Sequence, residues 1–577
     1  MNKRPIFLWI SLILLISSFL YSTPYSPKTI NIHSPLYEET DILYRLHGLA
    51  LPSGARPWST EEAALILSVI PDGGKSQALK EQALSRLETT LPKQDSNGLS
   101  HRFSTTVALE AYTHTNTTQF VVPQDWSYNM DRRLPLFDFR MELQWSNSFY
   151  FATSVELGAS AVTGQDKENV IVGKKEDDTT YGVYEDTGIG AIIPSADELP
   201  SGTSITSQRI AKLFQKAFNT NLITFDKRFQ DLWPQDSQVT LGGSWWNLSL
   251  GRGPVSWGVG QSGNLIIGSH INSHNNLNIN FFSEEFKLQF LYLFLPNPLQ
   301  RAEERIFMGH RLETQPLPWL RIAITENVMF SGENFHLGYI DPTYIYHNIY
   351  NSTNFNALAS AELHLAIAAG LSLHTEFALD QYQFANEAGK EANAMGLLVG
   401  MTHSVPVKKG FLSTTLEVVG TDPSLYRRDK VDFLVVRGLF SNGEPLIFDY
   451  LGYQWGSDSI ALSAEMVYLI PGKARYALQG LIHRQGRVSI FGPHYKETDG
   501  SYTNGGNSNI PGPPLSGDTL KDQIIITLAG SWWLPKQPIR LFGELTWMGK
   551  RTYTKSTKTS TDQRGDLQLI AGAVYTF

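Results

Sequence analysis

One segment of the chain, residues 238–270, collects residue types that proteins use to hold carbohydrate. Its sequence, QVTLGGSWWNLSLGRGPVSWGVGQSGNLIIGSH, contains Trp245, Trp246, Arg252 and Trp257 among many glycines. Aromatic faces stack on sugar rings, and an arginine donates hydrogen bonds to hydroxyl groups or to the carboxylates of acidic sugars. These four residues are therefore candidate polysaccharide-binding residues. The alternative is structural: the tryptophans belong to an aromatic belt and the glycines allow tight bends.

Two further patterns in this region have the spacing of known sites but the wrong surroundings. Gly258, Gly260 and Gly263 spell G-x-G-x-x-G, which binds dinucleotides only between a strand and a helix. Here a second β-like run, NLIIGSHINS, follows, so we interpret the glycines as a turn before a strand. His270 and His274 stand four apart but outside any predicted helix, so we expect ordinary lumen or loop histidines and no metal site.

The chain offers no pattern for catalysis. It contains 0 Cys, which excludes a thiolate nucleophile, a Cys-ligated metal and a disulfide framework. G-x-S-x-G does not occur, and no nucleophile has a recognisable base beside it. We therefore expect a protein that is not an enzyme, with no catalytic residue, no cofactor and no metal. A formal net charge of −8 also argues against a nucleic-acid partner.

The elements that must position these residues are strands. In LFDFRMELQW, apolar and polar residues alternate from Phe137 to Trp145, as in a strand with two different faces. Later segments of about ten residues alternate in the same way, which is long enough for a tilted crossing of a hydrocarbon layer. Their charged faces are too costly to leave in lipid, so they must line an aqueous or protein-filled lumen. The predicted lumen-lining polar residues are Glu362, His374, Glu376, Asp380, Glu417 and Glu544.

The connections between these segments alternate strictly in length. In the C-terminal half, short turns at AG, PVKKG, PGK and PKQP alternate with loops at 382–393, 421–456 and 485–522. Tight turns on one side and extended loops on the other are typical of outer-membrane barrels. We predict an all-β, antiparallel transmembrane β-barrel over residues 100–577. A long polar insert at 161–237 is expected to cover or fold into its mouth, with a short helix in SQRIAKLFQKAFNTN.

The N-terminal part differs in composition and in period. Residues 1–22 have two basic residues and then an apolar run from Phe7 to Leu20, which predicts a signal peptide. An uncleaved membrane anchor is the alternative, although the run is short for a spanning helix. Residues 31–95 repeat apolar positions at helical spacing, with Ser59 and Glu62 spaced as a capping box. We expect three helices that form a small periplasmic bundle without chemistry of its own.

Composition and the C-terminus agree with a membrane barrel. Aromatic residues make up 12% of the chain, as suits aromatic girdles at both membrane interfaces. The last strand-like segment ends on Phe577, with Tyr575 on the same face. This ending resembles the signal that barrel-assembly machinery reads on outer-membrane proteins. The expected location is therefore the cell outer membrane, with outer-membrane lipid and the assembly machinery as partners.

The segment GRGPVSWGVGQSGNL resembles the signature of the Wzi-type capsule-assembly family. The matching positions are Gly251, Arg252, Trp257, Gly258, Gly260, Gly263 and Leu265. LYEETDILYRLHGL and RPWSTEEAA are similar to the family's first two helices, and NALASAELHLAI, LEVVGTDPSLY and LGYQWGSDSIAL to its strands. The resemblance implies an outer-membrane barrel of about 18 strands, an N-terminal helical bundle on the periplasmic side and a lectin-like role without catalysis. The insert at 161–237 and the loop at 485–522 depart from the family.

We therefore expect a protein that binds and retains surface polysaccharide, such as a capsule or an exopolysaccharide, through many weak contacts of its outer loops. The alternative is a porin or a substrate-selective channel, and the two differ in whether the lumen is open. A barrel enzyme acting on lipid or protein would need a nucleophile and a base clustered at one rim, which the sequence cannot display.

Overall fold

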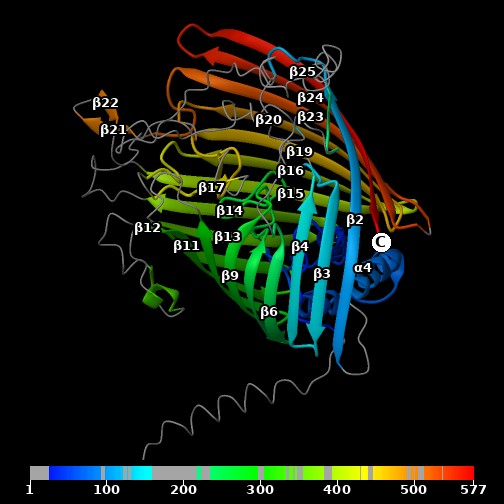
Figure 1. Cartoon of the computed structure of the whole chain (residues 1–577). Coiled ribbons are helices and arrows are strands. Elements are labelled where there is room, and N and C mark those ends of the chain that lie inside the picture. Colours follow the sequence, from blue (N-terminus) through cyan, green and yellow to red (C-terminus); the bar gives the residue numbers. More distant parts are fainter. Residues whose placement is uncertain are drawn as a thin grey trace, which may run out of the picture.

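A computed structural model shows a closed β-barrel with a helical bundle at one end (Figure 1). The structure describes residues 25–91, 98–120, 127, 132–158, 218–222, 234–295, 304–332, 337–341, 345–346, 355–381, 393–428, 431–438, 446–488, 490, 495–498, 501–504, 512–535 and 537–577. The predicted signal peptide, residues 1–22, lies outside the described residues, as does most of the insert at 161–237.

Within the described residues, eighteen antiparallel strands form the barrel wall. They are β2 (Leu99–His114), β3 (Phe137–Trp145), β4 (Phe149–Leu157), β6 (Ser237–Gly243), β7 (Trp246–Gly253), β9 (His274–Phe282), β10 (Phe286–Leu295), β11 (Glu304–Leu317), β12 (Leu320–Gly332), β13 (Phe355–Ala368), β14 (Leu371–Gln381), β15 (Ala394–Val407), β16 (Gly410–Thr421), β19 (Ser459–Ile470), β20 (Ala474–Gln485), β23 (Thr519–Trp533), β24 (Ile539–Thr554) and β25 (Thr559–Thr576). Because β2 pairs with both β3 and β25, the sheet closes on itself. The predicted antiparallel barrel of about 18 strands is confirmed.

The wall has an apolar outer face and a polar inner face, as the period of two predicted. In β25, Leu567 and Leu569 are 42% and 47% exposed, whereas the alternate residues Asp566 and Gln568 are 2% and 1% exposed. Large apolar residues are exposed in the same way on the neighbouring strands, for example Leu528 and Leu545, and a contiguous apolar surface of this kind indicates an apolar solvent. The outer face is therefore the lipid-facing one, and the inner face surrounds the lumen.

The two ends of the barrel carry different connections. Short turns join successive strands at the end that also holds the C-terminus, where Phe577 pairs with Thr105. Connections at the other end are longer, with one correction to the predicted strict alternation: only residues 555–558 join β24 to β25. Those two strands are instead extended, so the hairpin itself reaches beyond the wall (Figure 1).

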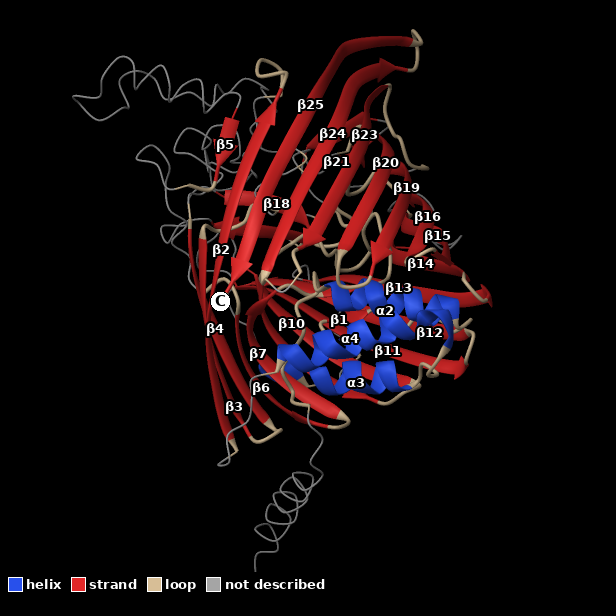
Figure 2. Cartoon of the chain, turned by 90° about the vertical axis from the view of Figure 1, so that its right-hand side faces the viewer, coloured by secondary structure: helices blue, strands red, loops and turns tan. Residues whose placement is uncertain are grey.

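Three helices form the N-terminal bundle: α2 (Pro35–Leu46), α3 (Thr60–Ser68) and α4 (Gln77–Thr90), the last preceded by the 3₁₀ turn η2 (Gly74–Ser76). The predicted cap is present, because Ser59 Oγ accepts from the Glu62 backbone N–H at 3.1 Å. Figure 2 shows the three helices gathered at the short-turn end of the strands. None of the described helices is long and apolar enough to span a bilayer.

The bundle is fixed to the barrel by its own backbone and by an ion pair. The Gly370 N–H donates to the Arg45 carbonyl at 2.6 Å, and the Ala50 N–H donates to the Pro318 carbonyl at 2.8 Å. Arg475 at the start of β20 forms an ion pair with Glu38 at 2.9 Å. Since Gly370 and Pro318 lie in two different short turns and Arg475 follows a third, the bundle is fixed at several points of the short-turn end.

Three short pairs of strands and one edge strand complete the described part of the fold. β1 (Ala55–Arg56) pairs with β8 (Ser256–Trp257), β17 (Leu434–Gly438) with β18 (Leu446–Tyr450), and β21 (Tyr495–Thr498) with β22 (Ser501–Asn504). β5 (Phe218–Thr220) pairs with the later part of β2, past the residues of β2 that pair with β3. The end of SQRIAKLFQKAFNTN is therefore a strand and not the expected helix, because the edge of β2 offers it hydrogen-bonding partners there; the rest of that segment lies outside the described residues.

Candidate functional site: the filled lumen

Two connections from the long-loop end fold into the barrel. The segment between β7 and β9, residues 254–273, and the segment between β16 and β19, residues 422–458, place their apolar side chains in one buried cluster. We call these described parts the plug. The cluster also includes inward side chains of the wall, such as Leu291, Phe307 and Leu398. The run NLIIGSHINS is thus part of a buried loop and not the expected strand, because Leu265, Ile266 and Ile267 pack against other plug residues instead of a neighbouring strand.

The plug meets the N-terminal bundle inside the barrel. Ala55 and Arg56 (β1), from the chain between α2 and α3, pair with Trp257 and Ser256 (β8) of the plug. The Gly258 N–H extends this ladder by donating to the Gly54 carbonyl at 3.1 Å. Segments from both ends of the barrel therefore share a β-ladder within the lumen.

Trp257 lies at the centre of this contact. Its side chain is fully buried, and its indole N–H donates to the amide oxygen of Gln289 on β10 at 2.7 Å. Its ring lies edge-on to Phe307 at 6.0 Å and 5.8 Å from the Arg311 guanidinium. Gly309 on β11 leaves room for the indole, because a Cβ there would lie 2.7 Å from the ring.

A buried charge network, which we call the junction network, joins the bundle to the wall beneath Trp257. Arg311 pairs with Glu313 at 2.7 Å and bidentately with Glu362. Lys287 donates to the Ala55 carbonyl at 2.8 Å and to Glu62 at 2.6 Å. Burial raises the pKa of Glu62, an effect that Lys287 partly offsets. Because each buried charge has a partner of opposite sign, the network tolerates its location.

The acidic residues of the inner wall hold the plug by its backbone. Glu417 accepts from the N–H groups of Gln261 and Ser262, each at 2.7 Å, and Glu376 accepts from Leu265 at 2.8 Å. Two further contacts complete this set: His374 lies 2.6 Å from Glu417, and Asp380 accepts from the Tyr426 N–H at 3.0 Å. These wall residues thus replace water as hydrogen-bond acceptors for buried peptide groups.

The remaining part of the lumen is polar. Arg132 pairs with Glu544 on β24, Arg133 with Glu110 on β2 at 2.7 Å, and His114 with Asp566 on β25 at 3.1 Å. We call this region, lined by β2, β24 and β25, the polar half of the lumen; the apolar half is the part of the wall from β10 to β19 that contacts the plug. Arg132 retains 48% side-chain exposure, so water reaches the polar half.

The other sequence-predicted binding residues are not gathered with Trp257. Trp245 lies in the short turn between β6 and β7, is 53% exposed and stacks on Phe281 at 5.9 Å. Trp246 begins β7 beside it. Arg252 lies near the opposite end of β7 and donates to Ser273 at 3.3 Å. The four residues are therefore distributed over three places: the short-turn girdle, the long-loop end of β7 and the interior.

Sequence reasoning missed Arg311, Glu313 and Lys287, although all three are buried and ion-paired in the interior. Arg311 and Glu313 are two apart on one face of β11, as the period of two requires, and both are 1% exposed or less. A charged pair on the inward face beside Gly309 was the available signal. The contacts of Lys287 with Ala55 and Glu62 could not be predicted from the sequence, because those residues lie more than 200 positions away.

Comparison with known proteins supports the fold. No protein-family model and no curated protein matches the sequence. The chain is similar in structure to Wzi from Escherichia coli, an outer-membrane protein involved in group 1 capsule assembly and described as a carbohydrate-binding β-barrel. The TM-score is 0.56 at 14% identity, over 95% of this chain and 99% of Wzi. The chain therefore has the fold of an outer-membrane barrel, which supports an outer-membrane location.

Porins and channels match less closely. OprD of Pseudomonas aeruginosa gives a TM-score of 0.37 at 7% identity, over 83% of this chain and 95% of OprD. An anion-selective porin from Comamonas acidovorans gives 0.32 at 10% identity, over 83% of this chain and all of the porin.

Proposed function

We propose that this protein binds and retains a surface polysaccharide at the long-loop end of an outer-membrane barrel and catalyses no reaction. In this arrangement the short-turn end and the helical bundle face the periplasm, as in barrels with tight periplasmic turns and long external loops. The structural likeness to a carbohydrate-binding barrel supports the proposal.

The observation that carries the proposal is the occupied lumen. The plug and the bundle meet through the β1–β8 ladder, and the plug core contains side chains from β10 to β19. A general porin needs an aqueous path, whereas a retention protein gains from rigid loops, because fewer degrees of freedom are lost on binding.

A substrate-selective channel is the second candidate, and the polar half of the lumen favours it. Polar side chains line this half, and one of its ion pairs, Arg132–Glu544, has an arginine that is 48% exposed. Conduction would follow this half and leave the plug in place.

The test combines conductance with polysaccharide retention. Full-length protein in planar bilayers is expected to give no steady large-conductance openings, and the same preparation is expected to be retained on immobilised polysaccharides. Steady single-channel currents together with no retention on any polysaccharide would replace retention with the channel.

A disulfide lock sharpens this experiment. Residues 56 and 256 are directly opposed in the β1–β8 ladder, where antiparallel Cα atoms lie about 4.5–5.5 Å apart and suit a disulfide. Because the chain has 0 Cys, the pair R56C/S256C is free of competing thiols. Retention is expected to be equal before and after reduction. A current that appears only on reduction would identify the plug as the gate of a channel and contradict the proposal.

A further inference from the structure

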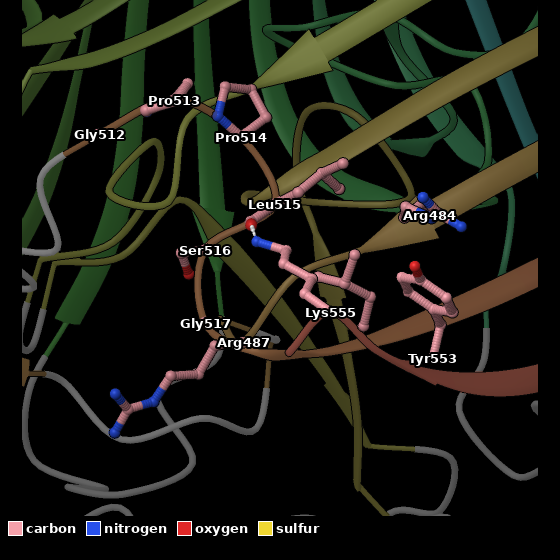
Figure 3. Close-up of a pocket in the computed structure, with 11 residues that line it drawn as sticks. Arg484, Arg487, Gly512, Pro513, Pro514, Leu515, Ser516, Gly517, Tyr553 and Lys555 are labelled. Atoms are coloured by element: carbon pink, nitrogen blue, oxygen red, sulfur yellow. Dashed lines mark hydrogen bonds between the residues drawn. The ribbon is translucent and has the colours of Figure 1, made fainter. Parts of the chain in front are cut away.

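A basic pocket lies at the long-loop end of β20, β23 and β24. Its volume is about 550 Å³, and the residues that matter for its chemistry are Arg484, Arg487, Leu515, Leu520, Tyr553 and Lys555. Figure 3 shows Arg484 and Tyr553 together on one side and Arg487 apart from them, with Lys555 donating to the Leu515 carbonyl at 2.6 Å. Among the residues that line it, three carry positive charge and none carries negative charge.

This pocket faces away from the lumen. On β20, Leu478 and Ile482 are 48% and 53% exposed on the lipid-facing side, and Arg484 continues that side. The intervening His483 points inward, is 6% exposed and packs on Trp455 of the plug at 4.7 Å. Tyr553 is in register with Leu520 on the same outward side.

The pocket lies where the apolar outer surface ends. At the short-turn end of β23, Trp532 donates to Tyr476 of β20 at 2.8 Å, as residues of an aromatic girdle do. Ile524, Ile526 and Leu528 follow outward along β23, each at least 40% exposed, and then Asp522. From Trp532 to Asp522 a tilted strand rises roughly 25 Å, the height of the apolar band of such barrels. The pocket therefore lies at the level of the lipid headgroups.

The charged residues that line the pocket are basic, and the carboxylates near them lie outside its lining. Asp522 is shared by Arg484 at 2.5 Å and Arg551 at 2.8 Å. Asp518 accepts from the Ser556 N–H at 2.8 Å beside Lys555, and Asp458 accepts from the Ser516 N–H at 2.7 Å. Arg484 also lies 5.2 Å from the Tyr553 ring, a contact that orients the guanidinium beside the pocket.

The wall of the pocket formed by residues 512–517 is fixed from behind. Asp458 accepts from the N–H and the hydroxyl of Ser516, at 2.7 and 2.5 Å, and from the Val488 N–H at 2.9 Å. The Arg487 N–H donates to the Ser516 carbonyl at 3.1 Å. Asp458, which directly precedes β19, therefore connects this wall of the pocket to the segment that follows β20.

We propose that this pocket binds the phosphorylated headgroup of a lipid in the outer leaflet. Arginine binds phosphate bidentately, and lysine adds a point charge. An acyl chain below such a headgroup would lie along Ile482 and Ile524, which are 53% and 40% exposed. A soluble polysaccharide has no reason to bind at the edge of the apolar belt, outside the mouth. This site is separate from the proposed polysaccharide-binding function and does not depend on it.

The test is native mass spectrometry of full-length protein in detergent with diphosphorylated lipid A and with the same lipid after enzymatic dephosphorylation. The variant R484Q/R487Q/K555Q removes the three lining cations. The matched control, K408Q/K409Q/K473Q, removes three exposed cations from short turns at the opposite end. Unchanged heat-dependent mobility in SDS gels establishes that each barrel is folded.

Wild type and the control are expected to retain the phosphorylated lipid, and the pocket variant to bind it at least tenfold more weakly. Equal retention by the pocket variant, or equal retention of the phosphate-free lipid, would overturn the proposal. Inorganic phosphate binding as tightly as the lipid would identify a site for the free ion and reject the lipid. Loss of polygalacturonate binding in the pocket variant, with lipid binding unchanged, would reassign the pocket to acidic polysaccharide.

Discussion

The inward carboxylates of the barrel wall have different partners in the two halves of the lumen. In the apolar half, inward carboxylates such as Glu376 and Glu417 hold the backbone of the plug, and the plug's side chains exclude water. In the polar half, carboxylates such as Glu544 and Glu110 pair with arginines. The inner wall carries carboxylates in both halves, and what differs is the partner that the incoming segments bring to them.

The difference has an energetic consequence. A charge pair surrounded by protein is costly to break, because the remaining partner stays buried and uncompensated. A pair that water reaches contributes about 0–1 kcal/mol, because solvent screens it. Matched substitutions in the two halves should therefore differ severalfold in their effect on stability.

The largest effect is expected for Arg311→Met in the junction network. Glu313 and Glu362 would remain at 0% and 3% exposure without their main partner, which destabilises by about 3–5 kcal/mol. Arg132→Met in the polar half is the comparison, with a smaller expected loss, because Arg132 itself is 48% exposed even though its partner Glu544 is 7% exposed. Reversible urea unfolding in lipid vesicles measures both. Similar losses in the two variants would mean that the two halves do not differ in hydration.

A smaller effect is expected when the plug is pushed from the wall. In Gly309→Ala the new Cβ would lie 2.7 Å from the Trp257 ring, and such overpacking costs about 1–3 kcal/mol. In Gly480→Ala the new Cβ meets nothing within 4 Å, so this control is expected to be neutral or slightly stabilising. Tryptophan fluorescence during unfolding measures the stability of both variants. An unchanged free energy of unfolding in Gly309→Ala would show that Trp257 can move away from the wall without loss of stability.

The third effect concerns the N-terminal segment, which contacts the inner wall at β3, outside the polar half. Lys28 donates to the Thr90 carbonyl at 2.8 Å and shares Glu142 with Arg102 and Arg140. Burial, together with these arginines, lowers the pKa of Lys28 to about 8. The undocked segment, with an ordinary lysine pKa near 10.4, binds more protons between these values. Docking should therefore become more stable as the pH rises from about 8 to 10.

Hydrogen-exchange protection of α4 measures this pH dependence after correction for intrinsic exchange rates. Protection in the wild type is expected to rise over that interval, and protection in Lys28→Met is expected to stay constant. A fall in the wild type alone would contradict the sign of the argument.

Much of the fold could be predicted because the rule that governs it is local. The period of two distinguishes lipid-facing from lumen-facing residues within a few positions, so Glu376 and Glu417 could be assigned to the inner face from their own strands alone. Ser59 and Glu62 predicted a helix start that the structure confirms. The binding prediction for Trp245, Trp246, Arg252 and Trp257 stays a prediction, because adjacency in sequence did not bring them together in space.

The sequence by itself determined which face of each strand meets lipid and where the three helices form, since these depend on residues a few positions apart. Only the tertiary structure decided what occupies the lumen. That outcome rests on Ala55 meeting Trp257 and on Glu417 meeting Gln261, contacts between segments more than 150 residues apart. An inward carboxylate has the same local sequence whether it faces water, an arginine or the backbone of a folded loop, so its partner becomes defined only when the chain has closed around it.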